Sequence, residues 1–271
     1  MKNFFQRWTP PAVLEIAAHL LNRRITLRGP YADWTQASAA ATGYGDPRIL
    51  EKSKQAMLKI KNGEAVAERD SVLFSRIPHS FPMLSCLLRT ALAQDGNLRV
   101  LDFGGALGSS YLQCREFLCD VRNLRWAVVE QPGFVACGQE LFSDDILSFY
   151  DDFNTCLNQE RPNLILLSSV LQYLEQPYLL VDKLKHSHVS YILFDRTPCA
   201  PNGKEVLTVQ VVPPKIYAAS YPAWIFDCDK LMRALSNRYD LLLEFDANDG
   251  CIRSGSLVAC YKGFFLRRCK K

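Results

Sequence analysis

From residue 97 onward, short apolar runs alternate with segments of helical periodicity. Five such runs come first: RVLDF (99–103), RWAVVE (125–130), ILSFY (146–150), PNLILLSS (162–169) and VSYILFD (189–195). Runs that are apolar at nearly every position are typical of strands buried on both faces, and helices between them imply right-handed crossovers and a parallel sheet. The pattern predicts a doubly wound, Rossmann-like α/β domain.

Beyond the fifth run, apolar runs and helical segments no longer alternate regularly. Residues 197–226 are rich in proline and tyrosine, and we expect them to form an irregular insert on the substrate side of the domain. Asp227 is a suitable N-cap for a helix. The expected elements after that helix are a strand at 239–245, a polar turn at 246–255 and a last strand at 256–268. A hairpin there makes the last strand antiparallel, so the expected sheet has seven strands and is mostly parallel.

The N-terminal third has a different, helical pattern. We expect residues 1–95 to form a helical extension or cap, and residues 96–271 to form the sheet domain. In segment 10–24 (PPAVLEIAAHLLNRR) apolar residues recur with helical spacing, which predicts an amphipathic helix. We expect it to dock on its own domain, although a helix lying on a membrane surface has the same pattern. A lysine-rich helix through Ile60 and a helix over 82–93 complete the region.

Charge and composition exclude several classes of protein. The chain has 271 residues, 48% of them hydrophobic, which is enough for one large globular domain with or without a decoration. A net charge of +4, spread among both signs, gives no electrostatic footprint for nucleic acid. The sequence has no apolar run long enough for a membrane span and no secretory signal pattern. We therefore expect a cytoplasmic protein, with peripheral contact at the inner face of the membrane left open.

The ten cysteines are scattered, without a CxxC pair or a Cys/His spacing typical of zinc sites. Reduced thiols are the usual state of such cysteines in a cytoplasm. We expect no disulfide framework and no metal site.

The stretch VLDFGGALGSSY (100–111) joins the first predicted strand to a helix through a glycine-rich turn. It lacks the GK[ST] ending of a P-loop, and Ala106 and Ser109 break the dinucleotide fingerprint GxGxxG. It matches the looser pattern of an acid followed by GxGxG, in which Asp102 is the acid and Ala106 replaces the middle glycine. We predict that five residues of this stretch bind a cofactor: Asp102, Gly104, Gly105, Gly108 and Tyr111.

Further polar residues follow the neighbouring strands. Glu130 ends the second strand, where a carboxylate can bind the two hydroxyls of a ribose. Asp151 or Asp152, after the third strand, could contact an adenine amino group or form a plain acidic loop. We also predict that Gln131, next to Glu130, and Ser169, after the fourth strand, bind the cofactor.

Together with these residues, several longer motifs resemble a family of class I S-adenosylmethionine-dependent methyltransferases whose genes lie mostly in bacterial surface-polysaccharide clusters. The resemblance runs from about Trp34 to the C-terminus and rests on GYGDPRIL, ERDSVLF, VLDFGGALGSSY, WAVVEQP, LSSVLQYLEQP, FDRTP and YAASYPAWIF. It implies the class I fold, S-adenosylmethionine as methyl donor, S-adenosylhomocysteine as product, and an acceptor that is a glycan, a nucleotide sugar or a lipid-linked sugar.

A sugar hydroxyl has a high pKa, so its methylation needs a general base or a metal. Asp195, which ends the fifth strand, is the expected base. Arg196 could pair with it or hold a phosphate of the acceptor, and Tyr173 is placed to face the methyl-donor centre. The residues expected to bind the acceptor are Arg69, Gln172, Tyr217 and Tyr221.

Two other functions stay open at this point. A catalytically degenerate subunit could keep the fold and bind a partner in glycan biosynthesis. A nicotinamide-dependent oxidoreductase would use a similar sheet, but the missing GxGxxG disfavours it.

Overall fold

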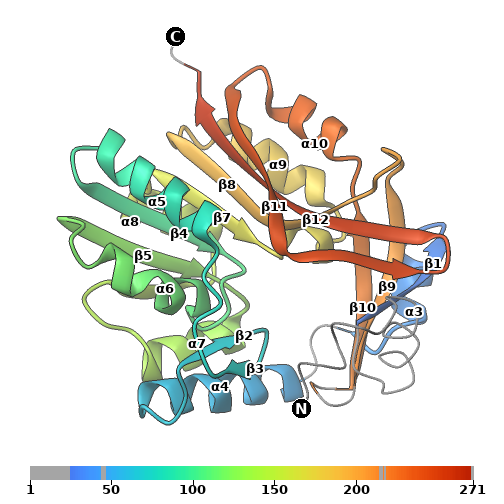
Figure 1. Cartoon of the computed structure of the whole chain (residues 1–271), viewed down its shortest axis with the longest axis horizontal. Helices are drawn as coiled ribbons and strands as arrows, with labels where there is room; N and C mark the ends of the chain where they lie inside the picture. Colours follow the sequence, from blue (N-terminus) through green and yellow to red (C-terminus); the bar gives the residue numbers. More distant parts are fainter. Residues whose placement is uncertain (1–24, 44–46, 214–215, 217, 270–271) are drawn as a thin grey trace, which may run out of the picture.

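The computed structural model describes residues 25–43, 47–213, 216 and 218–269 (Figure 1). The predicted amphipathic segment 10–24 and Tyr217 lie outside these residues. No helix in the described ranges is long and apolar enough to cross a membrane.

A sheet of seven strands forms the centre of the molecule, in the order β11-β12-β8-β7-β4-β5-β6. Its strands are β4 (Asn97–Phe103), β5 (Asn123–Val129), β6 (Leu147–Tyr150), β7 (Leu164–Ser168), β8 (Tyr191–Cys199), β11 (Tyr239–Ser254) and β12 (Leu257–Arg268). All neighbouring pairs from β6 to β8 are parallel, whereas β12 is antiparallel to both β8 and β11. This is the class I methyltransferase fold, and the prediction of a mostly parallel, doubly wound sheet with an antiparallel last strand is confirmed.

Two layers of helices cover the sheet. One layer consists of α5 (Phe81–Ala93), α6 (Ser109–Cys114), the 3₁₀ turn η1 (Arg115–Leu118) and α7 (Pro132–Leu141). The other consists of α8 (Phe153–Glu160), the 3₁₀ turn η2 (Leu171–Tyr173), α9 (Pro177–His186) and α10 (Cys228–Leu235). Alternate residues of the strands enter the two layers: Leu164 and Leu166 pack with the first, and Ile165 and Leu167 with the second. Burial on both faces explains why the strands are apolar at nearly every position.

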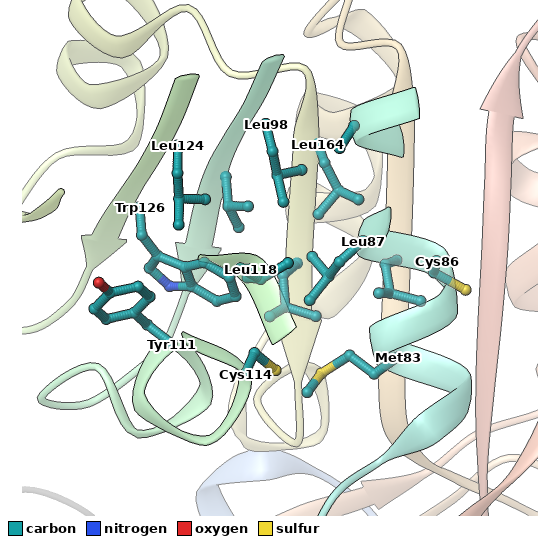
Figure 2. Packing of buried hydrophobic residues seen from close by; sticks show 14 of the residues in the cluster. Met83, Cys86, Leu87, Leu98, Tyr111, Cys114, Leu118, Leu124, Trp126 and Leu164 are labelled. Carbon is teal, nitrogen blue, oxygen red and sulfur yellow. The ribbon is translucent and has the colours of Figure 1, made fainter. Parts of the chain in front are cut away.

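Figure 2 shows the first of these layers from close by. Met83 and Leu87 of α5 pack over Leu98 and Leu164 of the sheet, and Trp126 is fully buried beside them. The helix predicted over 82–93 is therefore present, and it docks on the sheet as its apolar spacing indicates.

We expected residues 1–95 to be helical, but the described part of this region also contains three strands. Its elements are β1 (Thr26–Tyr31), α3 (Trp34–Ala39), α4 (Pro47–Lys61), β2 (Ala67–Arg69), β3 (Val72–Phe74) and α5. β2 and β3 form a short antiparallel hairpin. β1 pairs with β9, which belongs to the distant insert, and such a long-range partner leaves no local signal in the sequence.

The insert is also more regular than predicted, because it contains β9 (Val206–Val212) and β10 (Ala219–Ile225). These strands form an antiparallel three-stranded sheet with β1, in the order β1-β9-β10. Thr208 and Gln210 are buried in the middle strand and obscure its apolar pattern. Pro222 lies in β10 at the edge of the sheet, where proline is tolerated.

The turn predicted at 246–255 is wrong, because β11 continues to Ser254 and the hairpin closes only around Gly255. The two strands form an arm that reaches β1, where Leu27 N donates to Ser254 Oγ across 2.9 Å (Figure 1). We call residues 246–262 the β-arm. Its polar sequence resembles a turn because four residues, 247–250, bulge out opposite Tyr261, between the register pairs 246–262 and 251–260.

Cysteine pairing also departs from our expectation of reduced thiols. The structure contains the disulfides Cys199–Cys228 and Cys251–Cys260, which join residues 29 and 9 positions apart. The register of β11 and β12 brings Cys251 and Cys260 together, and Cys228, at the start of α10, reaches Cys199 of β8, so neither pair has a short CxxC spacing.

Candidate functional site

A cavity of about 630 Å³ lies beyond the carboxyl ends of β4, β5, β7 and β8. The β2–β3 hairpin, β9, β10 and the β-arm contribute residues to its other walls. In a doubly wound sheet this is where ligands bind, next to the point at which the strand order reverses. The predicted site residues that line this cavity are Arg69, Gly104, Gly105, Glu130, Ser169, Tyr173, Asp195, Arg196 and Tyr221.

The glycine turn after β4 forms one wall of the cavity. At Gly104 and Gly105 the neighbouring side chains leave no space for a Cβ atom. A Cβ on Gly104 would come within 2.3 Å of Val170 Cγ2, and the residue has a φ of +73°. A Cβ on Gly105 would lie 2.5 Å from the carboxylate of Asp102. Glycine is therefore required at both positions by packing against the protein's own side chains, and the backbone of both residues lines the cavity.

Ala106 adopts a φ of +50°, which is unusual for a residue with a side chain. This conformation costs about 1 kcal/mol, and such outliers persist where the surrounding structure holds them. The backbone N–H of Ala106 donates to the carboxylate of Glu130, so the turn and the end of β5 are joined directly.

Glu130 lines the cavity at the end of β5. Its Oε2 also accepts a 2.6 Å hydrogen bond from the backbone N–H of Gln131. Burial raises the pKa of this carboxyl, and the two backbone hydrogen bonds oppose the shift. The carboxylate is thereby held beside the glycine turn, with its charge only partly exposed to water.

Other predicted donor residues lie away from the cavity wall. Asp102 is buried behind the turn, and Gly108 is the N-cap of α6 with a φ of +89°. Tyr111 packs against the ring of Trp126, with ring centres 5.7 Å apart. Gln131 and Asp151 are exposed at the ends of their strands.

Asp195 ends the parallel part of β8 and is only 3% exposed. Its Oδ2 accepts a 2.9 Å hydrogen bond from Ser168 Oγ. Burial raises the pKa of Asp195, while Arg196, this hydrogen bond and Arg69 lower it. Gln172, which was expected to bind the acceptor, instead donates from Nε2 to Ser169 Oγ across 2.9 Å and does not line the cavity.

Arg196 forms ion pairs with two carboxylates from opposite sides of the cavity. Its Nε donates to Asp249 of the β-arm across 3.1 Å, and its Nη2 donates to Asp70 of the β2–β3 hairpin. Despite the cost of burial, the two carboxylates hold its pKa well above the usual value. The guanidinium thus binds two protein carboxylates, and its position fixes the arm and the hairpin relative to β8.

An aromatic pair lies on the side of the cavity formed by the insert. Tyr173 and Tyr221 meet edge to face, with ring centres 5.1 Å apart. Gln210 lies between their hydroxyls: it accepts from Tyr173 across 3.3 Å and donates to Tyr221 across 3.4 Å. Gln210 was not predicted as a residue of this cavity, because β9 itself was not predicted.

Glu68 is a further residue of the site and is only 3% exposed. Its carboxylate accepts a hydrogen bond from Ser109 Oγ, at the start of α6, and a 2.5 Å bond from the backbone N–H of Ser71. Burial raises its pKa. Its neighbour Arg69 lines the cavity and lies over the ring of Phe74 at 5.7 Å. The ERDS motif therefore ties the hairpin to the helix that follows the glycine turn.

No protein-family model and no curated protein matches the chain. Among solved structures, the N-terminal domain of EvdMO1, crystallised in the presence of SAH and D-fucose, is 15% identical with a TM-score of 0.47, over 83% of this chain and 97% of that one. Magnesium protoporphyrin IX methyltransferase from Synechocystis PCC 6803 with bound SAM is 13% identical with a TM-score of 0.41, over 69% and 79%. The glycopeptide N-methyltransferase MtfA with SAM is 9% identical with a TM-score of 0.43, over 66% and 92%.

Proposed function

We propose that this protein transfers a methyl group from S-adenosylmethionine to a sugar hydroxyl of a surface-polysaccharide precursor. The observation that carries the proposal is that the glycine turn, Glu130 and Asp195 line one cavity at the carboxyl end of the sheet. The turn and Glu130 have the features of a nucleoside site, and Asp195 has those of a proton acceptor. The glycan acceptor rests on the sequence motifs.

The donor half of the cavity fits S-adenosylmethionine by shape and charge. The backbone of Gly104 and Gly105 lines the cavity and can lie against the methionine portion, and the Glu130 carboxylate can accept hydrogen bonds from the ribose hydroxyls. When bound, the donor supplies an electrophilic methyl group on a positively charged sulfur. The carboxylates of Glu68, Glu130 and Asp195 favour a cation over the two phosphates of a nicotinamide dinucleotide.

On the acceptor side, Asp195 would take the proton of the sugar hydroxyl as the oxygen attacks the methyl group. Ser168 orients the carboxylate through its hydrogen bond to Oδ2, and burial raises its proton affinity. The rings of Tyr173 and Tyr221 provide an apolar wall on which a sugar ring can stack. Because Arg196 is paired with Asp70 and Asp249, a phosphate of the acceptor is not its partner in this proposal.

The test is to incubate the protein with S-adenosylmethionine labelled in its methyl group and an extract of nucleotide sugars and lipid-linked glycans, and then to identify the labelled product. Asp195→Asn should bind S-adenosylhomocysteine normally and lose transfer, whereas Asp182→Asn, at an exposed site, should keep both. Full transfer by Asp195→Asn would exclude Asp195 as the base. Donor binding without transfer to any acceptor would favour the non-catalytic subunit.

A further inference from the structure

A bulge in the β-arm places a carboxylate of β11 at the cavity, next to Arg196. Between the register pairs 246–262 and 251–260, residues 247–250 of β11 stand opposite Tyr261 alone. Asp249, within the bulge, pairs with Arg196 across 3.1 Å. Two further contacts hold the bulge: Ala247 is buried, and Asn248 Nδ2 donates to the backbone oxygen of His79 across 3.1 Å.

The Cys251–Cys260 disulfide joins the two strands at the first register pair after the bulge. Cys251 directly follows Gly250, which has a φ of +65°, and its Cα lies 4.1 Å from that of Cys260. Without the crosslink, the bulge would be held on that side by the backbone ladder towards the tip of the arm, by the packing of Ile252 and by the hydrogen bond of Ser254 to Leu27. The disulfide therefore limits the positions that Asp249 can adopt.

Accessibility differs between the two disulfides. Cys251 is exposed, and it borders the cavity. Cys199, in the other disulfide, is only 5% exposed. Cys199 also lies opposite Cys260 in the register of β8 and β12, so the two disulfides are neighbours, although Cys228 belongs to α10. A reductant in solution reaches Cys251 first.

We propose that Cys251–Cys260 is a site of thiol–disulfide exchange whose reduction releases the bulge from Arg196. A dithiol reductant attacks one protein sulfur as a thiolate, which forms a mixed disulfide and frees the other cysteine as a thiol. The second thiol of the reductant then displaces the first protein sulfur. The protein gains two electrons and two protons as two thiols, and the reductant leaves as a disulfide.

Reduction should act on the side of the cavity that holds Asp195 and Arg196, and leave the side formed by the glycine turn and Glu130 unchanged. Asp249 and Arg196 lie next to Asp195, whereas the glycine turn and Glu130 make no contact with the β-arm among the described hydrogen bonds and ion pairs. The inference concerns the arm itself and does not depend on the proposed methyl transfer.

The test is hydrogen exchange of the full chain, isolated without reductant and compared before and after dithiothreitol. We expect exchange of amides 247–250 to become at least about tenfold faster on reduction, with β7 unchanged, because opening of the bulge becomes more frequent. Cys251→Ser/Cys260→Ser should reproduce the reduced pattern and no longer respond. The control Cys199→Ser/Cys228→Ser should still respond, and so should Cys119→Ser at an exposed free thiol.

Two results would overturn the proposal. One is that thiol mapping finds Cys251 and Cys260 free in protein isolated without reductant and treated with a mild oxidant. The other is that reduction leaves the exchange of residues 247–250 unchanged. Titration with S-adenosylhomocysteine in both redox states is a separate readout: we expect equal affinity, and an absence of binding would contradict the proposed function while leaving the exchange result valid.

Discussion

The indole N–H of Trp126 donates a hydrogen bond to Asp102 Oδ2 across 3.0 Å, inside the sheet and directly behind the glycine turn. Asp102 is only 1% exposed, and its Oδ1 has no partner in the described part of the chain. Burial raises the pKa of Asp102 to about 7; the Trp126 bond opposes this rise and the charges of Glu130 and Asp195 add to it. We infer that Asp102 supports the turn from below, while Glu130 faces the ligand.

This burial predicts a specific dependence of stability on pH. In the unfolded chain an aspartate has a pKa of about 3.9, so from about pH 4 to about pH 7 the folded protein holds the extra proton. The contribution of Asp102 is therefore complete below about pH 4 and is lost as the pH rises through about 7. We expect Asp102→Asn to gain in unfolding free energy relative to the wild type from about pH 4 to about pH 7, by about 4 kcal/mol at most, with no further change above that range. Urea denaturation at intervals of pH measures this, and a constant difference would contradict it.

Substitution of Gly104 tests the close approach of the turn to its surroundings. Gly104→Ala combines a positive φ with a Cβ only 2.3 Å from Val170 Cγ2, whereas Gly203→Ala has a φ of +65° and nothing within 4 Å. We expect Gly104→Ala to lose about 2 kcal/mol more in unfolding free energy than Gly203→Ala. Equal losses would mean that backbone strain alone matters at Gly104.

The ion pairs of Arg196 should contribute more to stability than a surface pair. Its side chain is 13% exposed, whereas that of Arg233, which lies 3.7 Å from Asp227, is 68% exposed. We expect Arg196→Met to lower the unfolding free energy by about 3 kcal/mol, because carboxylates are left unpaired. Arg233→Met should cost less than about 1 kcal/mol. Similar losses in the two variants, measured by denaturant unfolding, would contradict this account of the site.

Substitution of Glu130 should lower the affinity for S-adenosylhomocysteine. Glu130→Ala removes the carboxylate proposed to bind the ribose, so we expect affinity for S-adenosylhomocysteine to fall by at least about tenfold, or about 1.4 kcal/mol. Asp182→Ala removes an exposed acid of α9 outside the cavity and should leave affinity unchanged. Isothermal titration of both variants decides, and unchanged affinity in Glu130→Ala would remove that assignment.

Most of the central sheet, and the residues that line the cavity at the ends of β4 and β5, could be predicted from the sequence because both depend on local signals. Buried parallel strands such as β7 are apolar at nearly every position, and the glycine turn follows directly after β4. The place of Glu130 beside the cavity could be predicted because an acid that ends a strand of such a sheet lies at the sheet's carboxyl edge.

The remaining parts depend on contacts between distant segments. β1 and β9 are far apart in the sequence, and buried Gln210 makes its hydrogen bonds only after they pair. Asp249 lies in a bulge whose sequence, DANDG, has the composition of a turn. The Cys251–Cys260 disulfide depends on the register of β11 and β12, and the Cys199–Cys228 disulfide on the packing of α10 beside β8, neither of which a single sequence reveals.

The most direct test of the central claim is calorimetric titration of the wild-type protein with S-adenosylhomocysteine, with NAD as the comparison ligand. The account predicts saturable binding of S-adenosylhomocysteine and none of NAD, because the cavity offers carboxylates and the backbone of the glycine turn. Binding of NAD without binding of S-adenosylhomocysteine, or no binding of either ligand, would contradict it.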